Sequence, residues 1–194
     1  MKKALMFALA LAVIPVGVDA QDTPSASCAD ISGLSPLEDL RSCGEQGDAY
    51  AQFNLGAMYA NGQGVPEDYV AAVRWYRLAA EQGYAQAQLY LGMMYANGEG
   101  VPEDDAEAVR WFRLAAEQGY QSAQFQLGYL YANGEGVPED YVLAYMWYNL
   151  AQAQGLGPAG SNKDRLEERM TPAQIAEAQR MSREWLEAHP PGGN

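Results

Sequence analysis

The stretch LGMMYANGEGVPED at residues 91–104 occurs in closely similar form twice more in the chain. Residues 55–68 read LGAMYANGQGVPED and residues 127–140 read LGYLYANGEGVPED, so the spacing is 36 residues in both directions. A fixed period of roughly 20–50 residues is typical of proteins built from stacked structural repeats. The sequence therefore predicts an array of such units.

The repeats extend beyond this stretch, and we place them at residues 47–82, 83–118 and 119–154. The first two agree at 26 of 36 positions, and the second and third agree at 21, without a gap. This level of agreement indicates that the three units share one fold.

Each unit contains two apolar runs with helical spacing, which we call helix A and helix B. In the second unit, helix A covers residues 85–96 and ends at Asn97-Gly98, because glycine tolerates the left-handed conformation at a helix end. Helix B covers residues 105–118, with Glu103-Asp104 at its start, where carboxylates cap free N–H groups. A single hairpin cannot bury its own apolar faces, so we expect an all-α solenoid of stacked helical hairpins, about three and a half repeats long.

Several residues return in every unit and are expected to serve the scaffold. A glycine in the middle of helix A predicts close contact between helices, since glycine is costly in an isolated helix. The repeated tyrosines and tryptophans are expected in the core, and the repeated Glu-Asp pairs are expected to cap helices rather than to bind calcium or a basic peptide. These sets are Gly56/Gly92/Gly128, Tyr59/Tyr95/Tyr131, Trp75/Trp111/Trp147 and the pairs at residues 67–68, 103–104 and 139–140.

The repeat resembles the Sel-one-like repeat family, a relative of the tetratricopeptide repeats. The residues that carry the resemblance in the second unit are Ala85, Ala87, Leu91-Gly92, Tyr95, Gly98, Gly100-Val101, Asp104, Ala108, Trp111, Ala115-Ala116 and Gly119. The third unit departs from the pattern at Gln152, which stands where the family has its second alanine. The resemblance implies a helical solenoid with an adaptor or scaffold role, and it brings no catalytic motif.

The first 20 residues have the composition of a secretory signal peptide. Lys2 and Lys3 precede an apolar run over residues 4–14, and Val18-Asp19-Ala20 supplies a small-residue cleavage site. The run is too short for a membrane anchor. We therefore expect cleavage after Ala20, a periplasmic or secreted mature protein, and no insertion into the membrane.

The segments that flank the repeats are expected to close the two ends of the array. Residues 21–34 are expected to form a flexible arm, and residues 35–46 a lone capping helix. After a turn at residues 155–158, a polar helix over 162–169 and a second helix from Pro172 to 188 are expected to form a degenerate capping pair. Residues 189–194 are expected to be a frayed tail.

Two cysteines, Cys28 and Cys43, are the whole complement of the chain. In an oxidising compartment an even count favours a disulfide, which would tie the arm to the capping helix. The alternative is two separate thiols. Two cysteines without a nearby histidine do not make a metal site.

The formal net charge of −13 argues against nucleic acids and anionic membranes as partners. It is compatible with a basic protein partner, and it is also ordinary for exported proteins. The only histidine, His189, lies near the C-terminus, and no catalytic triad or phosphate-binding loop can be built around it. We therefore expect a non-enzymatic protein without a cofactor.

Positions that vary between otherwise similar repeats are the best candidates for binding. Within helix A they follow i, i+4, i+7 spacing, which places them on one helical face. They are Tyr50, Asn54 and Ala57 in the first unit, Gln86, Tyr90 and Met93 in the second, and Ser122, Gln126 and Tyr129 in the third. In a solenoid such faces line an extended groove, and aromatic residues anchor interfaces.

The sequence thus predicts an adaptor that holds a protein or peptide in a helix-A groove in the bacterial envelope. One alternative is binding or hydrolysis of β-lactams or peptidoglycan fragments, as is associated with cysteine-rich relatives of the family, which carry a cysteine pair in each repeat. The repeats of this chain contain no cysteine. A second alternative is a structural subunit of an envelope assembly.

Overall fold

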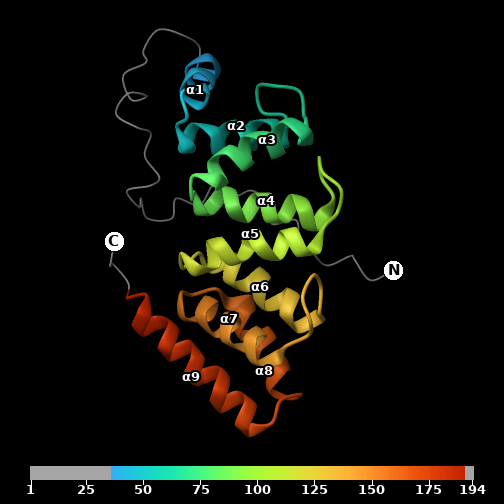
Figure 1. Ribbon diagram of the computed structural model, residues 1–194, viewed down its shortest axis with the longest axis vertical. Helices are drawn as coiled ribbons and strands as arrows, with labels where there is room; N and C mark the ends of the chain where they lie inside the picture. The colour runs from blue at the N-terminus through green and yellow to red at the C-terminus, as the bar shows by residue number, and fades with distance from the viewer. Residues whose placement is uncertain (1–35, 191–194) are drawn as a thin grey trace.

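The computed structural model describes residues 36–190, and within that range the chain forms nine helices and no strand. The helices are stacked along the long axis of the molecule (Figure 1). This arrangement confirms the predicted all-α solenoid. In chain order the helices are α1 (Pro36–Glu45), α2 (Ala49–Asn61), α3 (Tyr69–Glu81), α4 (Ala85–Asn97), α5 (Asp105–Glu117), α6 (Gln121–Asn133), α7 (Tyr141–Ala153), α8 (Gly157–Glu167) and α9 (Pro172–Ala188).

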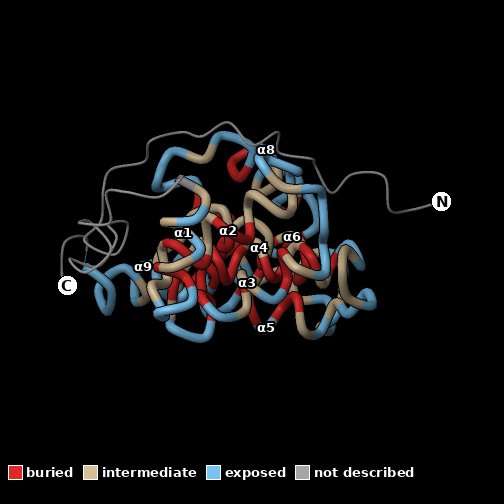
Figure 2. Tube along the Cα trace, turned by 90° about the horizontal axis from the view of Figure 1, so that it is seen from above, coloured by how far each residue is buried: buried red, intermediate tan, exposed pale blue. Residues whose placement is uncertain are grey.

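Helix A of the three repeats corresponds to α2, α4 and α6, and helix B to α3, α5 and α7. Each helix A packs against the helix B that follows it, and each helix B packs against the next helix along the chain. Seen along the stack, α2, α4 and α6 lie on one side and α3 and α5 on the other, with the buried residues between them (Figure 2). The core is therefore continuous from one repeat to the next.

The helix ends follow the capping signals in the sequence. Gly62, Gly98 and Gly134 adopt the left-handed conformation after α2, α4 and α6. Each helix B is capped by an aspartate whose side chain accepts backbone N–H groups from its first turn; in α5, Asp104 accepts from Ala106 and Glu107. The aspartates of the Glu-Asp pairs are helix caps, as predicted.

The mid-helix glycines allow helices A and B to approach closely. A Cβ atom on Gly92 would lie 2.7 Å from Cε1 of Phe112 in α5, closer than atoms can pack. The equivalent distances are 2.6 Å from Gly56 to Tyr76 and 2.8 Å from Gly128 to Tyr148. The predicted close contact is confirmed, and an aromatic ring on helix B occupies the space in every repeat.

A buried glutamine in each helix A joins consecutive repeats. Gln88 is 4% exposed, and its Nε2 donates to the carbonyl of Ala80 at the end of α3, 3.1 Å away. Its Oε1 accepts from Nε2 of Gln118, at the end of α5. Gln52 and Gln124 make the equivalent pairs of bonds. These side chains give a second hydrogen bond to helix-end carbonyls that already accept a backbone N–H from the following turn.

The repeated tyrosines are only partly in the core. Arg77 of α3 donates to the hydroxyl of Tyr95 in α4, and Arg113 donates in the same way to Tyr131 in α6. Tyr131 is buried, whereas Tyr95 is half-buried. Tyr59 and Tyr95 pack against the margin of the core, and Trp75 is half-buried; Trp111 and Trp147 are buried as expected.

The loops between helices A and B also join repeats. A Cβ atom on Gly100 would lie 2.3 Å from the carbonyl oxygen of Tyr69, in the first turn of the preceding helix B. Gly136 makes the same approach to Asp105. The glycines are therefore required both by the positive φ of this turn and by the closeness of the neighbouring backbone.

The C-terminal segment differs from the expectation in two ways. Helix α8 begins at Gly157 with Pro158 in its first turn, so the expected turn at residues 157–158 was wrong; proline suits that position because its missing N–H is not needed there. Helix α9, which begins at Pro172 as predicted after a Thr171–Gln174 capping box, packs against α7 rather than forming a hairpin with α8. The predicted signal peptide, the arm and Cys28 lie outside the described residues.

Candidate protein-binding face

The nine variable positions of helix A lie on α2, α4 and α6, and all nine are half-buried. None belongs to the fully covered core and none is freely exposed. Half-burial is typical of residues that form the margin between a core and an accessible surface. We call the surface formed by these nine residues the helix-A face.

An aromatic cluster lies beneath the first half of this face. The ring of Tyr90 stacks on that of Tyr76 at 5.5 Å, and Phe53 lies 5.6 Å from Tyr90 and 5.3 Å from Tyr84. Burial raises the pKa of the Tyr90 hydroxyl above its ordinary value. Tyr90 therefore contributes to packing as well as to the surface.

The second half of the face has a smaller aromatic group. Phe125 packs against Tyr148 at 5.5 Å between ring centroids, and Met93 and Tyr129 pack against the margin of the same core. Burial also raises the pKa of the Tyr129 hydroxyl. The face is thus backed by aromatic side chains along its length.

Four aromatic residues beside the face were not identified from the sequence: Phe53, Tyr84, Tyr120 and Phe125. Tyr84 and Tyr120 also vary between repeats, because the first unit has Asp48 at the equivalent position. Extending the comparison of repeats to the N-cap of helix A, where these residues lie, would have found them.

Two polar residues of the face already make hydrogen bonds within the chain. The amide of Asn54 donates to the carbonyl of Tyr50 one turn earlier, at 2.9 Å. The hydroxyl of Tyr84 donates to Oε1 of Gln86 at 3.1 Å. Each side chain keeps further donor or acceptor capacity for a partner.

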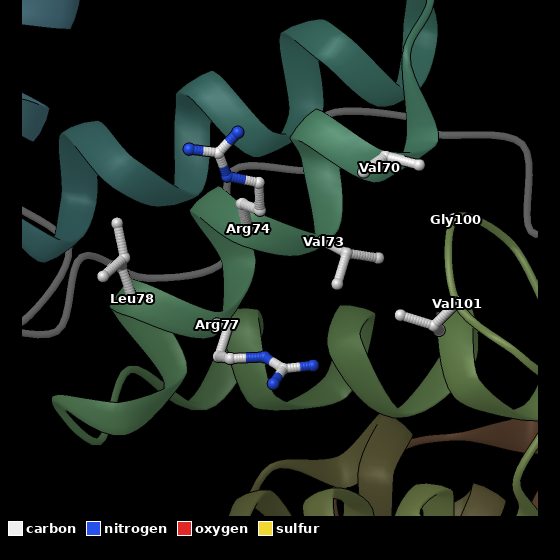
Figure 3. Close-up of a pocket in the computed structure, with 7 residues that line it drawn as sticks. All are labelled: Val70, Val73, Arg74, Arg77, Leu78, Gly100 and Val101. Atoms are coloured by element: carbon white, nitrogen blue, oxygen red, sulfur yellow. The ribbon is translucent and has the colours of Figure 1, made fainter.

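A hollow of about 490 Å³ lies beside α3, the helix B of the first repeat (Figure 3). It is lined by α3 and by the loop between α4 and α5, through Val70, Val73, Arg74, Arg77, Leu78, Gly100 and Val101. No residue of the helix-A face lines it. No binding surface was predicted at these residues from the sequence.

The candidate metal and catalytic groups remain scattered. Within residues 36–190, no group of three or more His, Cys, Asp or Glu side chains is arranged to hold a metal ion. Cys43 is buried in α1, and its pairing with Cys28 stays a prediction because Cys28 lies outside the described range. His189 stacks on Trp185 at 4.2 Å, and its Nδ1 lies 2.9 Å from the Trp185 carbonyl at the end of α9.

The repeats match a known family model, that of the Sel1 repeat, at residues 49–84, 85–120 and 121–156. The chain belongs to the Sel1 repeat family. Sel1-repeat proteins are in general scaffolds for protein–protein interaction, and most are not catalytic. A search among curated proteins found no match.

Solved structures of Sel1-repeat proteins are similar to this chain. One is a protective antigen present in uropathogenic Escherichia coli strains, with 39% identity and a TM-score of 0.72, over 78% of this chain and 32% of that one. This chain therefore corresponds to about a third of the antigen's length. A Sel1 repeat protein from Oxalobacter formigenes has 43% identity and a TM-score of 0.63, over 68% of this chain and 99% of that one.

A third structure, Helicobacter pylori cysteine rich protein B, has 21% identity and a TM-score of 0.51, over 67% of this chain and 98% of that one. At this identity the likeness concerns the fold alone. Among residues 36–190, no helix is both long enough and apolar enough to cross a membrane.

Proposed function

We propose that this Sel1-repeat chain is a non-catalytic adaptor that holds a protein or peptide partner on its helix-A face. One observation carries the proposal: the nine helix-A residues that vary between repeats at i, i+4, i+7 spacing are all half-buried and recur on the same helical face of each repeat. Variation at an accessible margin supports a surface shaped for a particular partner.

The chemistry of the face suits a protein or peptide. Tyr50, Tyr90 and Tyr129 each combine an aromatic ring with a hydroxyl, and such residues anchor interfaces because they bury much area with little loss of side-chain entropy. Packing beneath them limits their motion before binding, as for Tyr90 on Tyr76. A partner would therefore lose less free energy in ordering this surface.

The same proposal places the protein in the bacterial envelope, periplasmic or secreted, after cleavage following Ala20. The first 20 residues support this location through their basic, apolar and small-residue segments. The similar E. coli protein is described as a protective antigen, which is compatible with an accessible location for this chain as well.

The test is a crosslinked pull-down from periplasmic extract with the mature protein and two matched variants. The first, Asn54→Lys with Gln126→Lys, adds two positive charges to the helix-A face at half-buried positions. The control, Gln63→Lys with Asn97→Lys, adds the same charge at exposed positions outside the face. Tyr90 is left unchanged because its replacement would also disturb the aromatic cluster.

A protein captured by the wild type and the control but not by the face variant supports the proposal, provided that circular dichroism shows both variants folded. Equal capture by all three proteins would show that binding occurs elsewhere and would contradict the assignment of the face. Sequencing the N-terminus of the exported protein tests the cleavage site independently, and a first residue other than Gln21 would contradict cleavage after Ala20.

A further inference from the structure

The leucine near the end of helix B is buried in one repeat and exposed in the other two. Leu78, Leu114 and Leu150 occupy equivalent positions, 36 residues apart, and are 45%, 38% and 1% exposed. Helix α7 packs against α6 and α8 as α3 packs against α2 and α4, and α7 additionally packs against α9. The extra burial of Leu150 therefore accompanies the presence of α9.

Helix α9 is amphipathic, and its less polar side packs against α7. Its Ala178 and Ser182 are buried, and Trp185 meets Trp147 of α7 edge-to-face at 6.4 Å. The amide of Gln179 donates to the hydroxyl of Tyr145 in α7 at 3.3 Å. The outer side of helix B in this repeat scaffold is thus able to accept a second amphipathic helix.

The equivalent surface of the first repeat is apolar, hollow and unoccupied by the described part of the chain. Figure 3 shows Val70, Val73 and Leu78 of α3 around the hollow, with Val101 of the following loop opposite them. Val70 is 58% exposed and Leu78 45%. Single exposed apolar residues are common, but several around one concavity are typical of a binding surface.

The outer surface of α7, which α9 covers, differs in charge from the outer surfaces of α3 and α5, which it does not cover. Position 146, on the covered helix α7, is a buried methionine, whereas the equivalent positions on α3 and α5 are Arg74 and Arg110. Arg110 pairs with Glu107 and lies over the ring of Trp111. Arg74 is exposed and makes no hydrogen bond or ion pair with residues 36–190. Arg77, beside it, uses one N–H group on Tyr95 and retains others.

We propose that the α3 surface binds an acidic amphipathic helix of a partner protein. The apolar side of that helix would enter the hollow as α9 covers α7, and its carboxylates would pair with Arg74 and Arg77. An arginine guanidinium suits this role because it recognises carboxylates with directed, charge-assisted bonds. This second site lies on the side of the stack opposite the helix-A face (Figure 2), so an adaptor with both could join two proteins.

The test uses a fluorescein-labelled peptide that repeats the sequence of residues 171–189, with Arg180→Glu and Arg183→Glu to make it acidic. A second peptide keeps both arginines and replaces Glu177, Glu184 and Glu187 by lysine. Binding to the full mature protein is followed by fluorescence anisotropy. Arg74→Glu with Leu78→Glu changes the proposed site, and Arg183→Glu with Leu186→Glu makes the same changes at exposed positions on α9.

We expect saturable binding of the acidic peptide, weakened about tenfold or more by the α3 variant and unchanged by the α9 variant, since like charges across an interface are repulsive. Absence of binding, equal binding to both variants, or preference for the basic peptide would overturn the proposal. Sedimentation equilibrium provides a further check: a dimer that only the α3 variant abolishes would assign the surface to a second copy of the chain and overturn the acidic-helix assignment.

Discussion

Gln118 Nε2 donates to Gln88 Oε1 across 2.8 Å, so the end of helix B is joined to the interior of helix A within one repeat. Because Gln88 also donates to the carbonyl of Ala80, the same side chain joins this repeat to the preceding one. The bond to Ala80 is buried and the bond from Gln118 is partly buried, so both are shielded from water to different degrees. A buried polar group such as the Gln88 amide stabilises a protein only while its partners are present.

Gln88→Met is therefore expected to lower the free energy of unfolding by about 1 kcal/mol, since it conserves volume but removes both hydrogen bonds of the amide, while the Ala80 carbonyl keeps its bond from the Gly83 N–H. Gln63→Met is the control, because Gln63 is exposed. Urea denaturation followed by circular dichroism measures both. A change for Gln88→Met no larger than that for the control would contradict a structural role for this bond.

The hydrogen bonds of the buried glutamines could not be predicted from the sequence. Their 36-residue period is visible in the sequence, yet a polar residue between apolar ones predicts neither burial nor a particular partner. Mid-helix Gly92 was interpreted correctly because glycine in a helix has a known cost that only close packing offsets. The packing of α9 on α7 could not be predicted, because the repeat has decayed there and the available surface depends on the tertiary arrangement.

The candidate binding surfaces were predicted only in part from the sequence. Comparison of repeats found Tyr50, Tyr90 and Tyr129 because they vary on one helical face. It missed the hollow beside Val70 and Arg74, since those residues come from helix B, where an exposed valine and an arginine are unremarkable in sequence. We interpret them as part of a binding surface because α9 covers the equivalent surface of α7.

Gly100→Ala is expected to destabilise the protein more than Gly64→Ala. Both glycines have φ near +71°, at +71° and +72°, so both substitutions place an alanine in the left-handed conformation. An added Cβ on Gly100 would collide with the Tyr69 carbonyl at 2.3 Å, whereas on Gly64 the nearest atom is the flexible end of Met58 at 3.4 Å. The difference between their unfolding free energies isolates the contact between repeats.

We expect Gly64→Ala to lower the free energy of unfolding by about 1 kcal/mol. Gly100→Ala should lower it by at least about 1–3 kcal/mol more, because the backbone must move to relieve the clash. Thermal and urea denaturation of the two variants measure this difference. Equal losses would mean that the loop retreats from α3 without cost, and would contradict the view that it helps to hold consecutive repeats together.

Gly92→Leu is expected to overpack the contact between α4 and α5, at a cost of about 1–3 kcal/mol. The clash is with the Phe112 ring, which is buried and has no free space to occupy. Gly157→Leu is the control, because no atom lies within 4 Å of a Cβ built there. An unchanged melting temperature for Gly92→Leu would contradict the prediction.

Tyr76→Phe is expected to leave the protein as stable at neutral pH or to stabilise it by about 1 kcal/mol, since the substitution removes a buried hydroxyl without a partner. Among the described residues, no hydrogen-bond partner reaches this hydroxyl, and the second repeat already has Phe112 at the equivalent position. Urea denaturation at pH 7 measures the change, and a loss greater than about 1 kcal/mol would indicate a hydrogen bond of real value.

The same substitution is expected to change the response to alkali. Burial raises the pKa of the Tyr76 hydroxyl above its ordinary value of 10.0, so ionisation is less favourable in the folded protein than in the unfolded chain. The contribution of this group to stability is complete below the unfolded pKa and is lost as the pH rises towards the folded one. Stability should therefore fall less steeply above about pH 10 in Tyr76→Phe than in the wild type. Parallel pH profiles from about pH 8 to 11 would show that Tyr76 ionises as easily in the folded protein as in the unfolded chain, contrary to its burial against Phe53 and Tyr90.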